Sequence, residues 1–446
     1  MASVDTTRNN RQSDKTVTAT VGQTAAGKMV SGTRKPDMTG GMPAAEQGMR
    51  NVLEAGGMWT RDAKAPSYDE LRPYGHRETS GFPVYKDLEA RLLEATGHPD
   101  PEIAHLMATC AAYSYSDPAT LSMIMARMGL EDNQCRMIRT SVDAMLIDST
   151  AFLIQSKSGK VGILCYRGTA PMNLIDWMSG IDVEPERMGY QISDPCATVH
   201  AGVYRNVRAT RFEVMNALRL ACDRQSVRAM DMGGVSQHNG NPQAMGVTQS
   251  HGDLRMEGNL EALYITGHSL GGAMAALMGV MIRHERKYRE AFADRLRAVY
   301  TFGQPMIGDR AFAEACESDE FLRQNVIRYV YDGDVVPHLP STLSGAFRHF
   351  GREMHYRVPH LRNSMVNMMS YPRCSSQMRK GRWEARRHPA QQMMGLLEIP
   401  MSVMGFVARK FEATRSLPVV YSADDHLPQH YVSALTPPGV QNEFGD

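Results

Sequence analysis

The sequence of 446 residues predicts an α/β fold in which a mostly parallel central sheet is flanked by helices. Residues 263–266 are apolar and β-branched, which predicts a short buried strand, and the Ala/Met/Leu run at 273–282 predicts a buried helix. Apolar runs at 161–166 and 326–331 predict two more strands. Strands separated by helical segments favour a parallel sheet with helices packed on its faces.

The turn between strand 263–266 and helix 273–282 reads Gly-His-Ser-Leu-Gly-Gly, with Ser269 as its serine. A Gly-x-Ser-x-Gly turn between a strand and a helix is typical of a nucleophile elbow, in which the glycines leave room for a strained serine. The start of the helix directs its dipole and its free N–H groups toward that serine. This setting favours Ser269 as a nucleophile over a plain Gly/Ser turn, and the N–H of Leu270 as an oxyanion donor.

A serine nucleophile needs a base to take its proton and a carboxylate to orient that base. Asp334 lies in the turn after predicted strand 326–331, where the acid belongs in the chain order serine, acid, histidine. Asp332 is more simply an ordinary turn carboxylate. Near the end of the chain, His426 and His430 are both candidate bases, and the residues alone do not choose between them.

Six short motifs occur in an order that resembles the class 3 lipase family, which includes the fungal triacylglycerol lipases. They lie at residues 166–169, 199–204, 267–272, 301–309 and 334–340, and at Asp425-His426 with Tyr431 five residues after the histidine. The resemblance covers residues 100–222, 260–340 and 415–436. It implies an α/β-hydrolase fold with Ser269, Asp334 and His426 as the catalytic triad, and His430 as a minor alternative.

The resemblance also implies roles for residues beside the triad. Thr169, directly after predicted strand 161–166, would supply the second oxyanion donor through its backbone N–H and its hydroxyl. His268 would be a packing residue of the elbow, because its side chain points away from that of Ser269.

The segment after Thr169 corresponds to the mobile lid of the family. Met172, Ile175 and Trp177 give it more apolar surface than a solvated loop carries, so they are expected to contact acyl chains. Ordinary packing of a helix on the core would produce the same composition.

The implied activity is that of a serine carboxylester hydrolase acting on lipid esters, such as an acylglycerol or a phospholipid, through an acyl-enzyme. This chemistry requires no metal or organic cofactor. Two alternatives stay open, which are a catalytically idle lipase-like scaffold and an acyltransferase that uses the same triad. The acyl acceptor depends on the geometry of the site, so product analysis has to separate transfer from hydrolysis.

Composition limits the other classes of function. The formal net charge of +1 gives no general attraction for nucleic acid. The seven cysteines include no Cys-x-x-Cys pair, which argues against a disulfide framework and against zinc. The longest apolar stretch, at 273–282, is too short to span a membrane, and the N-terminus has no apolar run, so a cytoplasmic protein is expected.

The chain is expected to contain a polar N-terminal tail (1–80), a lipase domain (81–436) and a short C-terminal tail (437–446). Within the domain, the polar stretch 224–258 is expected to be a flexible surface insert. Its His238 and His251 are expected to be solvated rather than metal ligands.

A second insertion, residues 341–415, combines thirteen Lys/Arg and four Asp/Glu with apolar, Met-rich segments. This composition suits either a cap over the active site or an element that contacts a membrane or lipid surface. The cap is favoured because Pro400 and Gly405 would interrupt a long amphipathic helix.

Overall fold

The computed structural model describes ten stretches of the chain, all within the compact unit Val52–Asp446. They are residues 85–95, 98–142, 147–168, 185–188, 192, 196–232, 255–357, 381–386, 389–392 and 424–437. The predicted tail 1–80 and most of both predicted insertions lie outside the described residues.

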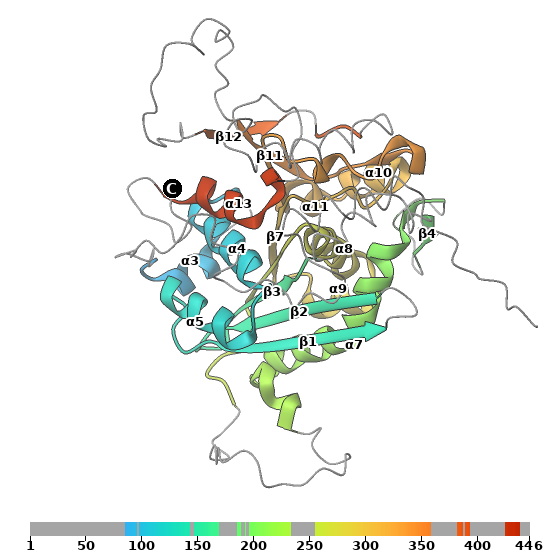
Figure 1. Ribbon diagram of the computed structural model, residues 1–446. Helices are drawn as coiled ribbons and strands as arrows, with labels where there is room; N and C mark the ends of the chain where they lie inside the picture. The colour runs from blue at the N-terminus through green and yellow to red at the C-terminus, as the bar shows by residue number, and fades with distance from the viewer. Residues whose placement is uncertain are drawn as a thin grey trace, which may run out of the picture. The chain divides into compact units, whose positions relative to one another are not determined.

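Eight strands of the described chain form one sheet in the order β1-β2-β3-β6-β7-β9-β11-β12 (Figure 1). They are β1 (Gln134–Val142), β2 (Ile147–Gln155), β3 (Val161–Tyr166), β6 (Ala262–His268), β7 (Leu296–Phe302), β9 (Val326–Tyr331), β11 (Arg352–Arg357) and β12 (Arg382–Arg386). The pairs from β3 through β6, β7 and β9 to β11 are parallel, whereas β1, β2 and β12 add antiparallel edges. The predicted strands are confirmed, and the sheet is mostly parallel as expected.

Helices pack on both faces of this sheet (Figure 1). They are α3 (Leu88–Glu94), α4 (Pro101–Tyr113), α5 (Pro118–Met128), α7 (Ala201–Cys222), α8 (Leu270–His284), α9 (Arg286–Phe292), α10 (Arg310–Ser318), α11 (Glu320–Asn325) and α13 (Pro428–Leu435). Asp100 and Asp117 cap the N-termini of α4 and α5, because their carboxylates accept hydrogen bonds from backbone N–H groups of the first turn. In each helix a proline follows the capping aspartate.

Alternate residues of the central strands enter two separate cores. In β3, Leu164 and Tyr166 join the core beneath α7 and α8, whereas Ile163 and Cys165 join the core beneath α4 and α5. Both faces are therefore buried, which explains the continuous apolar runs of these strands. The second core also holds α13, so the last described helix packs beside α4 (Figure 1).

A smaller sheet has the order β10-β8-β5-β4. Its strands are β4 (Pro185–Arg187), β5 (Thr198–His200), β8 (Gly308–Asp309) and β10 (Phe347–Arg348). The Asp309 carboxylate links this sheet to α10, because it accepts the Thr198 N–H at 2.9 Å and caps the helix at the Phe312 N–H.

Described parts of the two predicted insertions belong to the ordered fold. The first insert begins with the 3-10 helix η2 (Val227–Met232), where buried Val227 donates its N–H to Gln155 and accepts from Arg136. The N-terminal residues of the insert are therefore attached to the fold at Val227, so an exposed loop would begin later than residue 224. In the second, β10, β11 and β12 extend the two sheets, and the Met-rich segments predicted as a cap lie outside the described residues.

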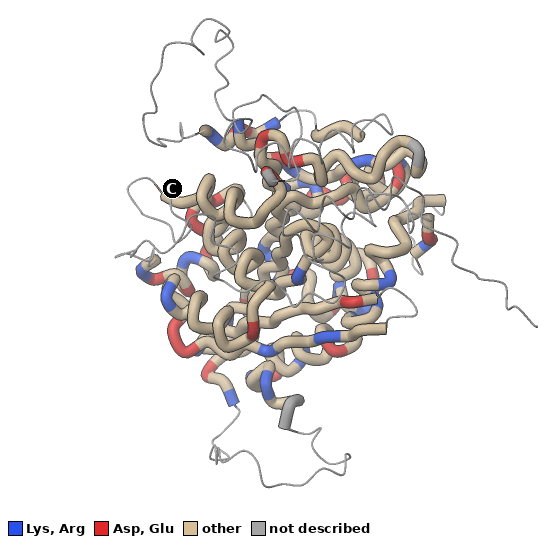
Figure 2. Tube along the Cα trace, in the orientation of Figure 1, with Lys and Arg blue, Asp and Glu red and all other residues tan. Residues whose placement is uncertain are grey.

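Residues with basic and with acidic side chains are interspersed along the described chain (Figure 2). This distribution agrees with the formal net charge of +1. None of the described helices is both long and apolar enough to cross a bilayer.

Candidate active site

Ser269 stands between β6 and α8 in a backbone conformation that non-glycine residues rarely adopt. Its φ is 59° and its ψ is −133°, and its N–H donates to the Phe302 carbonyl at 2.9 Å. A side chain at Gly271 would overlap the Tyr166 carbonyl, and one at Gly267 would overlap Gly271 itself. The turn therefore has the tight geometry expected of a nucleophile elbow, and the surrounding structure holds a strained serine in place.

Asp334 and His426 form a buried pair, although 92 positions separate them in the chain. The His426 Nδ1 lies 2.9 Å from Oδ2 and 3.1 Å from Oδ1 of Asp334. The carboxylate also accepts the Tyr431 hydroxyl at 2.5 Å and the Val336 N–H at 2.8 Å. Because Nδ1 donates to the carboxylate, Nε2 of His426 carries the lone pair that a general base needs.

The surroundings keep Asp334 ionised. Burial raises the pKa of this carboxyl, but the neighbouring His426, the Tyr431 hydroxyl and the Val336 N–H outweigh burial, so the net pKa lies below its ordinary value. Burial next to Asp334 raises the pKa of Tyr431 far above its usual range, so that its hydroxyl stays a donor.

Gly303 explains how the pair fits against the end of β7. This residue has a φ of +58°, and a side chain there would come within 2.8 Å of both Asp334 Oδ2 and His426 Nδ1. Only glycine combines this conformation with such a close approach. Since Phe302 accepts the Ser269 N–H, the end of β7 contacts both the serine and the Asp334–His426 pair.

Two polar atoms that the chemistry requires have no partner among the described residues. They are Oγ of Ser269 and Nε2 of His426, and both are buried. No hydrogen bond joins them in this structure, as is common in sites without substrate. The start of α8 lies beside them, and the first N–H groups of a helix, beginning with that of Leu270, have no carbonyl partner within it.

The turn after β3 approaches the serine. A side chain at Gly168 would overlap the Tyr115 hydroxyl and would lie 3.2 Å from the Ser269 Cβ. The predicted oxyanion residue Thr169 follows Gly168 directly but lies outside the described residues. So do the predicted lid residues Met172, Ile175 and Trp177.

The two candidate bases occupy different places. His426 contacts Asp334, whereas the ring of His430 faces Tyr331, with centroids 5.4 Å apart. The side chain of His268 hydrogen-bonds the Tyr115 hydroxyl and the His426 carbonyl. Sequence reasoning missed Tyr115 and treated Tyr431 only as a marker of the motif, because neither contact has a signal in local sequence.

No cluster of three or more potential metal ligands occurs within the described stretches of the chain. Among the described cysteines, Cys110, Cys165 and Cys316 are buried thiols.

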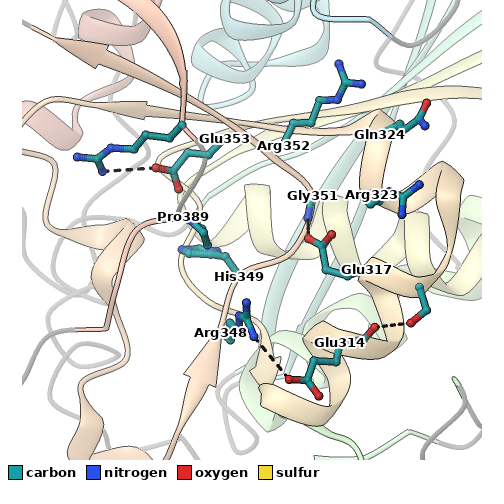
Figure 3. A pocket seen from close by; sticks show the side chains of 12 residues that line it. Glu314, Glu317, Arg323, Gln324, Arg348, His349, Gly351, Arg352, Glu353 and Pro389 are labelled. Carbon is teal, nitrogen blue, oxygen red and sulfur yellow. Dashed lines mark hydrogen bonds and ion pairs between the residues drawn. The ribbon is translucent and has the colours of Figure 1, made fainter.

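A hollow of about 760 Å³ lies apart from this site, where β9 and β11 begin (Figure 3). None of the predicted triad residues lines it. Its glutamates are already bonded, with Glu314 paired to Arg348, Glu317 bonded to the Gly351 N–H, and Glu353 paired to Arg328 and Arg386. Each of these three glutamates therefore has an arginine or a backbone N–H beside it.

Known proteins share this arrangement of motifs. Residues 163–344 match the sequence model of the family Lipase (class 3). This part of the chain is similar to class 3 lipases. The matched residues include the elbow and Asp334, whereas His426 lies beyond them. The family assignment and the α/β-hydrolase fold predicted from the motifs are thereby confirmed.

Curated relatives match parts of this chain. A triacylglycerol lipase of Nicotiana tabacum is 39% identical over 95 residues, which are 21% of this chain and 16% of the relative. One from Arabidopsis thaliana is 26% identical over 223 residues, 46% of this chain and 39% of the relative. A lipase of Rhizomucor miehei is 40% identical over 89 residues, 20% of this chain and 23% of the relative. The matches thus span less than half the length of these relatives.

Among solved structures, the lipase of Rhizopus microsporus var. chinensis is similar, with a TM-score of 0.42 and 17% identity. The similarity covers 83% of this chain and 94% of that one.

Proposed function

We propose that this chain is a serine carboxylester hydrolase that acts on lipid esters through Ser269, His426 and Asp334. The observation that carries the proposal is the coexistence of a strained, buried serine at a helix start and an ionised Asp334 bonded to Nδ1 of His426. Both Oγ of the serine and Nε2 of the histidine lack partners in the described chain. These are the groups that react in acyl transfer.

In the proposed reaction, Ser269 attacks the ester carbonyl while Nε2 of His426 takes its proton. Asp334 holds the imidazole as the Nδ1–H tautomer and stabilises the imidazolium that forms. The alcohol leaves with the proton from His426, and an acyl-enzyme remains. Water, activated by the same histidine, then releases the acid and restores the serine.

The tetrahedral intermediates carry negative charge on the former carbonyl oxygen. The N–H of Leu270 at the start of α8 is one proposed donor, and the approach of Gly168 to the Ser269 Cβ supports Thr169 as the other. Loss of one such donor typically lowers turnover by about 10²–10³-fold.

The proposed substrate class is an ester with a long acyl chain, such as an acylglycerol or a phospholipid. The apolar side chains of Met172, Ile175 and Trp177 support this choice, as do the relatives named triacylglycerol lipase. We further propose the domain boundaries 81–436, with the basic, Met-rich part of 341–415 as a cap that can also contact a lipid surface.

Hydrolysis of p-nitrophenyl esters of increasing acyl length, by the wild type and by Ser269→Ala, tests the proposal. We expect rates that rise with chain length and a fall in kcat of about 10⁶-fold in the variant. Equal thermal melting of the two proteins is the control for folding. Addition of an alcohol, with analysis of the products, distinguishes hydrolysis from transfer to another acceptor.

Absence of turnover by folded wild type, both in solution and on emulsified esters, would contradict the proposal and leave a lipase-like scaffold. Activity that survives in Ser269→Ala would place the chemistry at other residues.

A further inference from the structure

The residue before the proposed nucleophile, His268, makes two side-chain hydrogen bonds that the reaction steps above do not use. Its Nε2 lies 2.6 Å from the carbonyl oxygen of His426, and its Nδ1 lies 3.1 Å from the Tyr115 hydroxyl. A carbonyl only accepts, so Nε2 carries the proton and donates it. Nδ1 then accepts from the Tyr115 hydroxyl. Together the two bonds select one tautomer of His268 and tie it to the main chain of the proposed base.

His268 is also uncharged, which allows it to lie beside a base that becomes positively charged during the reaction. The two imidazole rings lie 4.5 Å apart between centroids, and His268 is 3% exposed. Burial, and secondly the neighbouring His426, lower the pKa of His268 to about 3. His268 is therefore neutral at the pH of ester hydrolysis and does not repel an imidazolium on His426. Burial also raises the pKa of Tyr115, which keeps its hydroxyl protonated.

His426 needs more than its carboxylate to hold its direction. It is the last residue of the one-turn helix η5 (Asp424–His426), and Asp334 holds its side chain only at Nδ1. A ring held at one atom can still swing about that atom if its backbone shifts. The bond from His268 fixes the carbonyl of the same residue, so main chain and ring are anchored from two sides.

We propose that His268 is a positioning residue of this site. Held by Tyr115 as its Nε2–H tautomer, it fixes the main chain at His426 and thereby directs Nε2 of that base toward Ser269. This inference rests on the proposed hydrolase function. A displacement of about 1 Å in a reacting group costs about 10²-fold in rate, which sets the expected size of the effect.

Two substitutions at His268 separate positioning from packing. His268→Leu removes both hydrogen bonds, whereas His268→Gln keeps an N–H donor at a similar reach. We expect kcat to fall about 10²-fold in His268→Leu with KM unchanged, and most of that loss to be recovered in His268→Gln. The far-downfield proton resonance of His426 Nδ1–H should broaden in His268→Leu and persist in His268→Gln. Equal kcat in the two folded variants, or a change confined to KM, would overturn the proposal.

Tyr115→Phe removes a single hydroxyl and leaves the packing of the ring in place. We expect a fall in kcat of about 5-fold, the value of one hydrogen bond, and no additional fall when it is combined with His268→Leu. Additive losses would show that Tyr115 does not act through His268. If His268→Leu does not fold, an unchanged kcat in Tyr115→Phe overturns the proposal.

The proton resonance separates failure of this inference from failure of the proposed function. If wild type hydrolyses no ester, the hydrolase proposal fails. The resonance still reports whether His268 holds His426.

Discussion

Two buried carboxylates lie at opposite ends of the same pair of neighbouring strands, and their partners differ. Asp334 follows β9 and bonds to an imidazole and a tyrosine hydroxyl. Glu353, in β11, lies 3.1 Å from the buried guanidinium of Arg328 and 3.5 Å from that of Arg386. The first pair includes an imidazole whose other nitrogen can exchange a proton, whereas a guanidinium, the partner in the second, does not release its proton. Burial of a carboxylate alone therefore does not mark a reactive site; the chemistry of its partner does.

The largest expected effect is on turnover, at the Asp334 end. Asp334→Asn keeps the shape of the side chain but favours the wrong tautomer of His426, so kcat should fall about 10⁴-fold, or about 5 kcal/mol in activation free energy. Steady-state kinetics on a p-nitrophenyl ester measure the loss, and thermal melting controls for folding. A fall of less than 10-fold would mean that Asp334 does not orient the base.

At the Glu353 end, stability should change instead of turnover. Glu353→Gln leaves the buried charge of Arg328 without its counterion and should lower the free energy of unfolding by about 3–5 kcal/mol. The matched control is the double variant Arg328→Met/Glu353→Leu, which removes both charges and should recover much of that loss. Urea unfolding measures the difference. A catalytic defect in folded Glu353→Gln at full stability would contradict the structural role of this pair.

Tyr431→Phe tests how much the hydroxyl contributes to the charge on Asp334. Removal of one hydrogen bond to an ionised group should cost about 1.5–3 kcal/mol of stability, with a smaller decrease in kcat than Asp334→Asn causes. Urea unfolding and ester hydrolysis on the same preparations give both quantities. No change in either would show that the Tyr431 hydroxyl does not support the carboxylate.

The smallest expected effect is on the free energy of unfolding at acidic pH. Because the pKa of Asp334 lies below its ordinary value of 3.8 in the folded protein, the unfolded chain binds its proton more tightly. The carboxylate thus contributes stability above pH 3.8, and this contribution is lost as the pH falls through the folded pKa. Unfolding of wild type and Asp334→Asn between pH 5 and 2 should converge toward low pH. Parallel curves would contradict a lowered pKa.

Short-range features of this protein were predictable from residues close together in the chain. The elbow at Ser269 needs only a strand, two glycines and a helix start, all within about twenty residues, and the turn at Asp334 follows its own strand directly. Both positions depend on local backbone geometry, which local sequence encodes. The first residues of the polar insert, around Val227, were misjudged because their burial comes from β2 and its neighbour β1 rather than from their own surroundings.

Contacts between residues far apart in the chain were decided only by the tertiary structure. By the residues alone, His426 and His430 were equivalent, and the motif favoured the first; the folded chain brings His426 to Asp334 across 92 positions and turns His430 toward Tyr331. Tyr115 contacts His268 although 153 positions separate them, and the sequence near either residue does not predict this contact. The sequence by itself determined the elbow, the strand ends and their polar residues. Which distant side chain meets each of them depends on how α4, α13 and the sheet pack together, because that packing is a property of the whole core and not of any single segment.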